Sequence, residues 1–377
     1  MEETMKTKNR LIVDQLPVKT WNRLNVNEAV IEWDEARTAD LGTESHMAGS
    51  DEPVRIAARG EGEFSRKQVK VEAAPGTRIT VYEQMEAEQH FHLHTTLVAH
   101  ENAVIRLVQL QDTREGSLLY NQIDGHCEEN GHIELIQMFV GRGHLYSDSR
   151  FTLQGDRSGL EADIGYLGRK DQKLDMNLAV DHFGKHTESE INAAGALMDS
   201  SAKVFRGTID FKNGSSDSVG NEKETVLMLG ENVINKTVPL ILCAEENVVG
   251  NHGATIGELD DETLFYFESR GIGREAAEDR TAGPEDRRRG NGREDRSAFE
   301  RGALTWHTIS EKTFRCFSRT RSPIWTTRRR PSGPSALSTR KAAFTAIPTP
   351  TPCGACIPSA WKRRKFMKTP GSPFGIS

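Results

Sequence analysis

Apolar and polar residues alternate along most of the chain between residues 78 and 258. Residues 103–111 and 132–140 show this period-two pattern most clearly. Such alternation predicts strands with one buried face. Turn-forming pairs such as Asn130-Gly131 and Asn213-Gly214 separate the strands, and helical periodicity is nearly absent from this span. The pattern therefore predicts a mainly β fold made of many short strands.

Three architectures fit such a series of strands: a sandwich, a barrel and a solenoid. A solenoid buries one face of each strand by stacking successive turns of the chain. It therefore needs no sharp sequence repeat. The alternation alone does not choose among the three.

The ends of the chain differ from this core. Residues 1–75 are acidic and mixed, and a short helix is expected near residues 25–33 with Asn25 or Asn27 as its cap. Asp260 or Asp261 is a plausible N-cap for a helix over residues 262–267. We therefore expect a helical or irregular region over 1–75, a β core over 76–258 and the start of a C-terminal helical region over 259–278.

The net charge of −6 hides a sharp division. Residues 279–377 hold 21 Lys and Arg against 7 Asp and Glu, a net +14, which leaves −20 on residues 1–278. Ten of the 14 prolines also lie after residue 278. This segment has no buried pattern, so we expect a disordered, non-native-looking tail over 279–377.

No apolar run is long enough to span a bilayer, and the first residues lack the apolar core of a secretory signal. Five scattered cysteines do not indicate a disulfide framework. These features favour a cytoplasmic protein with reduced thiols, and no membrane partner is expected.

Three histidines at period two, His90, His92 and His94, occupy one face of a predicted strand. A His-x-His pair occurs in cupin-like metal sites, so a metal-dependent all-β enzyme is one hypothesis. The other interpretation is an outward polar ladder with Phe91 and Leu93 facing inward. The ladder is favoured because the metal motif is incomplete.

Two linked motifs near residue 260 are the most specific feature of the chain. Residues 252–257 have the sequence His-Gly-Ala-Thr-Ile-Gly, and residues 264–272 have the sequence Leu-Phe-Tyr-Phe-Glu-Ser-Arg-Gly-Ile. Together they resemble the C-terminal signature of the SufB/SufD family of iron–sulfur cluster assembly scaffolds, in its SufD form. The resemblance covers about residues 16–278.

The resemblance implies a right-handed parallel β-helix and a non-catalytic scaffold subunit. The implied partners are a SufB-like subunit and a SufC-like ATPase, with no nucleic acid. The sequence itself holds no phosphate-binding GxxxxGK[ST] loop, so the resemblance assigns ATP hydrolysis to the SufC-like partner. It implies no intrinsic cofactor, although a transient iron–sulfur cluster could form with SufB.

His252 is the candidate metal ligand, because an imidazole suits iron or zinc. In the SufD family the matching histidine lies near the SufB interface and is implicated in nascent cluster assembly. The family often has a cysteine two residues earlier, where this chain has Gly250. The alternative is a structural histidine in a turn, donating a hydrogen bond to a backbone carbonyl.

The tail after Glu278 has three competing explanations: a basic nucleic-acid-binding arm, a disordered linker and a shifted reading frame. Back-translating residues 322–334 in another frame can yield Asp-Asn-Ala-Ala-Thr-Thr, which resembles a motif of cysteine desulfurases. The other offset, read from Glu278, can yield an amphipathic SufD-like ending. Our hypothesis is a single-base slip near Glu278, which is expected to impair the SufC contact that the family's C-terminal helices make.

Overall fold

The protein is a parallel β-solenoid in which the chain winds between two stacked sheets. The computed structural model describes residues 10–20, 22–47 and 53–258. Within these residues each sheet has eight strands, and every strand of the two sheets pairs in parallel with the strand two places away in sequence. The prediction of a mainly β, parallel solenoid is confirmed.

The first sheet, called sheet B, consists of β3 (Ala39–Met47), β5 (Phe64–Ala73), β7 (His90–Ala99), β9 (Leu118–Cys127), β11 (His144–Leu153), β13 (Lys173–His182), β15 (Ala202–Phe211) and β17 (Ile234–Cys243). The second sheet, called sheet C, consists of β4 (Val54–Arg59), β6 (Arg78–Glu86), β8 (Val104–Gln111), β10 (His132–Phe139), β12 (Gly159–Gly168), β14 (Glu188–Met198), β16 (Ser218–Leu229) and β18 (Val248–Glu258).

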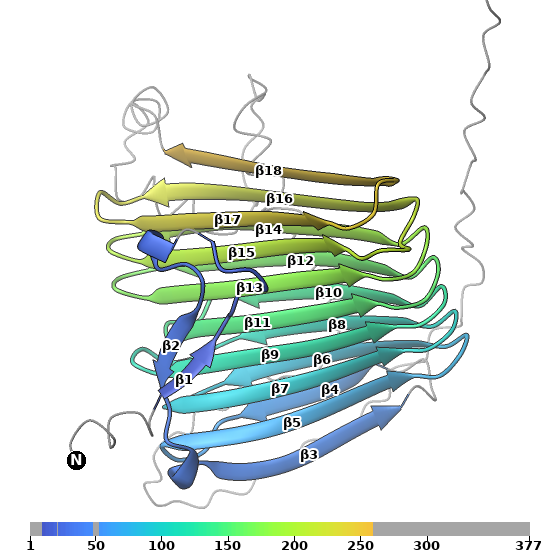
Figure 1. Cartoon of the computed structure of the whole chain (residues 1–377). Helices are drawn as coiled ribbons and strands as arrows, with labels where there is room; N and C mark the ends of the chain where they lie inside the picture. The colour runs from blue at the N-terminus through green and yellow to red at the C-terminus, as the bar shows by residue number, and fades with distance from the viewer. Residues whose placement is uncertain (1–9, 21, 48–52, 259–377) are drawn as a thin grey trace, which may run out of the picture. The chain divides into compact units, whose positions relative to one another are not determined.

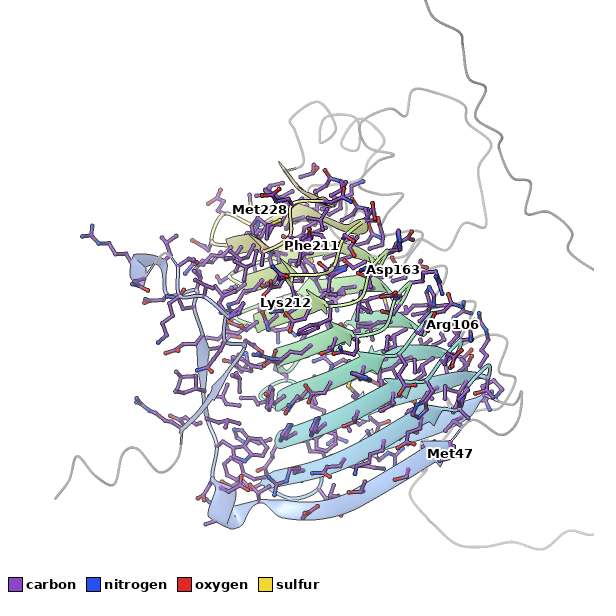
Figure 2. All side chains as sticks on the ribbon, turned by 45° about the vertical axis from the view of Figure 1, so that its right-hand side comes forward. Met47, Arg106, Asp163, Phe211, Lys212 and Met228 are labelled. Carbon is purple, nitrogen blue, oxygen red and sulfur yellow. The ribbon has the colours of Figure 1, made fainter. Side chains whose placement is uncertain are left out.

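The coil is right-handed. In Figure 1 the front strands run to the right and the rear strands run to the left while the chain climbs from blue to yellow. This is the hand that parallel crossovers adopt almost without exception. Figure 2 shows the same stack turned, with Met47 on β3 at one end of sheet B and Met228 on β16 near the other end of the stack.

The interior between the sheets explains the alternation in the sequence. Inward residues such as Phe91, Leu93 and Ile105 are fully buried in one continuous apolar cluster that extends through the stack. Their neighbours along each strand point outward and are partly exposed. Burial of one face per strand is the driving force that the period-two pattern anticipates.

The N-terminal region differs from the helical expectation. Its described residues hold no α-helix but two 3-10 helices, η1 (Asn22–Leu24) and η2 (Glu35–Arg37), and an antiparallel pair, β1 (Arg10–Val13) and β2 (Ala29–Glu32). The solenoid also begins at β3 rather than at residue 76. The physical reason is visible in β2, where Ala29 and Ile31 are buried while Val30 and Glu32 are exposed.

This antiparallel pair packs on the outer face of sheet B. Val13, Ile31 and Trp33 form an apolar cluster with Phe64, Tyr120 and Tyr146 of the sheet. No helix among the described residues is long and apolar enough to cross a membrane. The predicted helical segment 259–278 and the tail 279–377 lie outside the described residues.

Candidate functional site

His252 lies in the middle of β18, the last strand of sheet C, and not in a turn. Its side chain is exposed, and it has no hydrogen-bond or ion-pair partner among the described residues. A β-carbon placed on Gly250 would touch Ile241 and Phe211, so this face of β18 is the inward one. His252, two residues on, shares that face. It therefore sits at the end of the solenoid interior within the described residues.

The residue directly below His252 in the parallel ladder is Glu222 of β16. Glu222 is 4% exposed, and one of its carboxylate oxygens has no hydrogen-bond partner. Burial, reinforced by the nearby Glu224 carboxylate, raises the pKa of Glu222 to about 8. At neutral pH this side chain is mainly the neutral acid, which can donate its proton.

Beside Glu222 is a fully buried ion pair between Lys203 and Glu224. The Lys203 Nζ lies 2.5 Å from the Glu224 Oε1, and the Tyr166 hydroxyl donates to the same oxygen at 2.9 Å. Burial lowers the pKa of Lys203 even though Glu224 favours its charged form. Together with Glu222, these side chains form a polar cluster inside the solenoid, one ladder step below His252.

The two last strands leave open sheet edges around this cluster. Within the described part of the chain, no strand pairs with the outer edge of β17 or of β18. Val249 and Ile256 of β18 and Ile234 of β17 are each more than half exposed. Unpaired strand edges with apolar side chains are suited to pairing with another chain.

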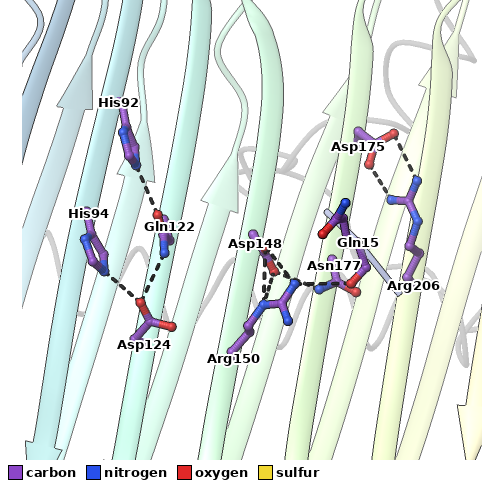
Figure 3. Close-up of polar contacts among 10 residues, drawn as sticks. All are labelled: Gln15, His92, His94, Gln122, Asp124, Asp148, Arg150, Asp175, Asn177 and Arg206. Atoms are coloured by element: carbon purple, nitrogen blue, oxygen red, sulfur yellow. Dashed lines mark hydrogen bonds and ion pairs between the residues drawn. The ribbon is translucent and has the colours of Figure 1, made fainter. Parts of the chain in front are cut away.

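The three histidines of β7 form the outward ladder that the sequence favoured, with Phe91 and Leu93 inward. The His92 ring stacks on Tyr120 at 4.5 Å, and its Nε2 contacts the Gln122 Oε1 at 3.2 Å. His94 contacts the Asp124 carboxylate at 2.7 Å, and Gln122 also donates to Asp124 (Figure 3). Burial lowers the pKa of His92 to about 4, so this ring is neutral at physiological pH. These contacts give the ladder a packing role.

Another histidine, His182, has both ring nitrogens in hydrogen bonds. Its Nδ1 lies 2.7 Å from the Thr187 hydroxyl and its Nε2 lies 3.0 Å from the Ser189 hydroxyl, with the ring fully buried. These contacts tie a strand to the following corner. Across the described ranges, no three His, Cys, Asp or Glu side chains are grouped so that they could hold a metal ion. Among the described residues, His252 is thus not part of a group of three such ligands.

The buried cluster around Lys203 was not predicted from the sequence. A signal for it exists, because Lys203 has the same strand parity as the inward Phe205 and Ile209. Glu222 and Glu224 likewise share the parity of the inward Val226. A charged residue on the buried face of a strand is unusual enough to mark a partnered cluster.

Comparison with known proteins gives a consistent family assignment. The family model described as "SUF system FeS cluster assembly, SufBD core domain" matches residues 55–280. The chain is 27% identical over 189 residues to the iron–sulfur cluster assembly protein SufD of Bacillus subtilis, covering 50% of this chain and 43% of that protein.

Two SufBD family proteins show similar identity. One, from Staphylococcus saprophyticus, is 25% identical over 48% of this chain and 39% of its own length. Another, from Trieres chinensis, is 26% identical over 58% of this chain and 47% of its own length. The matched region thus spans less than half the length of each of these three relatives.

Proposed function

The chain belongs to the SufBD core family of SUF iron–sulfur cluster assembly proteins, and from this membership we propose that it is a SufD-like scaffold subunit. The observation that carries the proposal is the family match over residues 55–280, which spans the solenoid from β4 to β18 and includes His252. In this role the chain itself catalyses no reaction. A SufC-like ATPase supplies ATP hydrolysis, and the complex works in the cytoplasm.

The partner surface in this proposal is the end of the solenoid formed by β17 and β18. A SufB-like subunit pairs with the edges of these strands that no described strand occupies, where the exposed Val249, Ile256 and Ile234 become buried. His252 then lies at the subunit boundary and supplies one imidazole to a nascent cluster. Iron and sulfide are cargo here, and the SufB-like partner supplies the other ligands, because the described residues hold no group of three His, Cys, Asp or Glu side chains that could bind a metal ion by itself.

The polar cluster below His252 supports this assignment. Glu222 is a neutral acid near pH 7 because its pKa is about 8, and it lies in register with His252. It can therefore exchange a proton as ligands at the boundary are loaded. Lys203 and Glu224 hold the adjacent interior in a fixed, fully paired arrangement.

Reconstitution tests the proposal. The chain is co-purified with a SufB-like subunit, and the iron and acid-labile sulfide of the complex are measured for the wild type and for His252→Ala. We expect the variant to fold and to bind the partner but to carry several-fold less cluster. Because His252 is exposed, its replacement should remove little core packing and change the free energy of unfolding little.

The matched control is His186→Asn, at an exposed corner histidine with a φ of 55° that asparagine tolerates. This variant should retain normal cluster content. Equal cluster content in the wild type and in His252→Ala would show that His252 is not a cluster ligand and has only a structural role. Failure of the wild-type chain to bind a SufB-like subunit would contradict the scaffold function itself.

A further inference from the structure

The N-terminal strap, defined as the described residues from 10 to 37, is held on sheet B through its own backbone. Arg150 of β11 donates to the Gln15 carbonyl at 3.2 Å, and Arg206 of β15 donates to the Val26 carbonyl at 2.5 Å. Lys236 of β17 donates to the Leu24 carbonyl at 2.8 Å. Three cations from three strands of the sheet thus bind the strap.

Asp14 is the buried acid of this strap. Its side chain is 0% exposed, and neither carboxyl oxygen has a hydrogen-bond partner among the described residues. The titratable and charged groups that face it come from four strands of the sheet: Tyr120, Tyr146, Asp148, Asp175 and Arg206. Arg150 lies close by, because it donates to the carbonyl of the next residue, Gln15.

Both arginines are already committed to other acceptors. Arg206 pairs with Asp175, and Arg150 donates to Asp148 at 3.1 Å (Figure 3). Asp148 also accepts a hydrogen bond from Asn177 at 2.7 Å. Asp14 therefore faces two carboxylates that already have their own partners, and no described cation donates a hydrogen bond to it.

A buried carboxylate in this position lacks a donor and is repelled by both neighbours. A proton on Asp14 removes both costs, because it cancels the charge and supplies a hydrogen-bond donor toward Asp175. We propose that Asp14 is a proton-dependent latch, which holds the strap on sheet B while its carboxyl is protonated and loosens the strap when it ionises.

The direction of titration agrees with this geometry. Burial first, and then Asp175 and Asp148, hold the pKa of Asp14 well above its usual range, while Arg206 opposes them. The docked strap binds the proton more tightly than the free strap does. Docking is therefore strongest below the ordinary aspartate pKa and weakens as the pH rises toward the raised pKa, by up to about tenfold per pH unit.

Hydrogen exchange of the full chain, read by mass spectrometry from pH 5 to pH 9, tests the latch. After correction for intrinsic exchange, we expect protection of peptides from the strap to fall as the pH rises. Peptides from β10 and β12 report the global fold in the same samples. The decisive variant is Asp14→Asn, which is isosteric, is neutral at every pH and suits the φ of 54° at this position. Its strap should remain protected throughout.

The matched control is Glu32→Gln, which removes an exposed acid from the same strap and should follow the wild-type curve. Superimposable curves for the wild type and Asp14→Asn would overturn the latch, as would a wild-type curve that is flat across the range. A flat curve for Glu32→Gln would assign the response to the overall charge of the strap and would also overturn it.

Discussion

Lys203 and Glu224 form an ion pair inside the solenoid, with 2.5 Å between Nζ and Oε1 and both side chains shielded from solvent. The pair links β15 of one sheet to β16 of the other across the interior. Taking both charges out of water is costly, and their mutual attraction and the hydrogen bond from Tyr166 offset that cost.

Breaking this pair should destabilise the protein strongly. We expect Lys203→Met to lower the free energy of unfolding by about 3–5 kcal/mol, because Glu224 is left buried and uncompensated. The double variant with Glu224→Gln should recover most of the loss. Denaturant unfolding provides the measurement.

Lys170→Met is the control for this prediction. Lys170 forms the same type of pair with Glu115, but both side chains are more than half exposed. Its loss should cost less than about 1 kcal/mol. Similar losses for the two lysine variants would show that burial does not determine the strength of the Lys203 pair.

Stability should fall as the pH rises because of Glu222. Its pKa in the folded chain is about 8, above the ordinary glutamate value, so its contribution is complete at low pH and is lost between about 4.5 and 8. Over that window, the wild type should lose on the order of 1 kcal/mol per pH unit relative to Glu222→Gln. Unfolding midpoints between pH 5 and pH 9 would reveal this. Glu231→Gln, at an exposed turn, should not alter the slope.

The corner at Gly184 should not accept a side chain. A β-carbon there would lie 2.1 Å from the carbonyl oxygen of Gly155, the glycine at the neighbouring corner of the stack. Since backbone must move to relieve this contact, Gly184→Ala should cost about 1–3 kcal/mol in thermal or denaturant unfolding. Gly253→Ala, which meets no atom within 4 Å, should stay within about 0.5 kcal/mol of the wild type. Equal effects would show that the corners are not closely stacked.

Restoring the reading frame after Glu278 should restore binding of a SufC-like ATPase. Residues 279–377 carry a net +14 and ten prolines, so we expect them to lack the amphipathic pattern of a helical contact surface. A pull-down that compares this chain with a frame-restored chain provides the test. Equal retention of the ATPase by both would place the contact elsewhere, and DNA sequencing across the Glu278 codon checks the slip directly.

The strands of the solenoid were predictable because alternation is a local property of the sequence. Phe91 and Leu93 face inward, on the opposite side of the strand from the intervening His92, as the alternation predicted. The choice of a parallel solenoid over a sandwich or a barrel came from the family resemblance, since alternation does not specify which strands pair.

The strap and the candidate site were harder to predict, for different reasons. The alternation over β2 is only four residues long, which is too short to distinguish a strand from a helix. Lys203 and Glu224 are 21 residues apart, and only the stacking of one turn on the next brings them together. Gly253, directly after His252, suggested a turn at this histidine, but pairing with β16 keeps this segment extended.

Side chains of the solenoid donate hydrogen bonds to backbone carbonyls of the strap, and these bonds give the fold a long-range connection that stacked repeats normally lack. Each turn of a solenoid contacts only its neighbours, whereas the strap joins β11, β15 and β17 through contacts between residues 135, 180 and 212 positions apart. The segment near the start of the chain can complete its contacts only after the last turns have formed. Strap docking is therefore expected to be a late folding event, and pulse-labelled exchange should show strap amides gaining protection after those of the central turns.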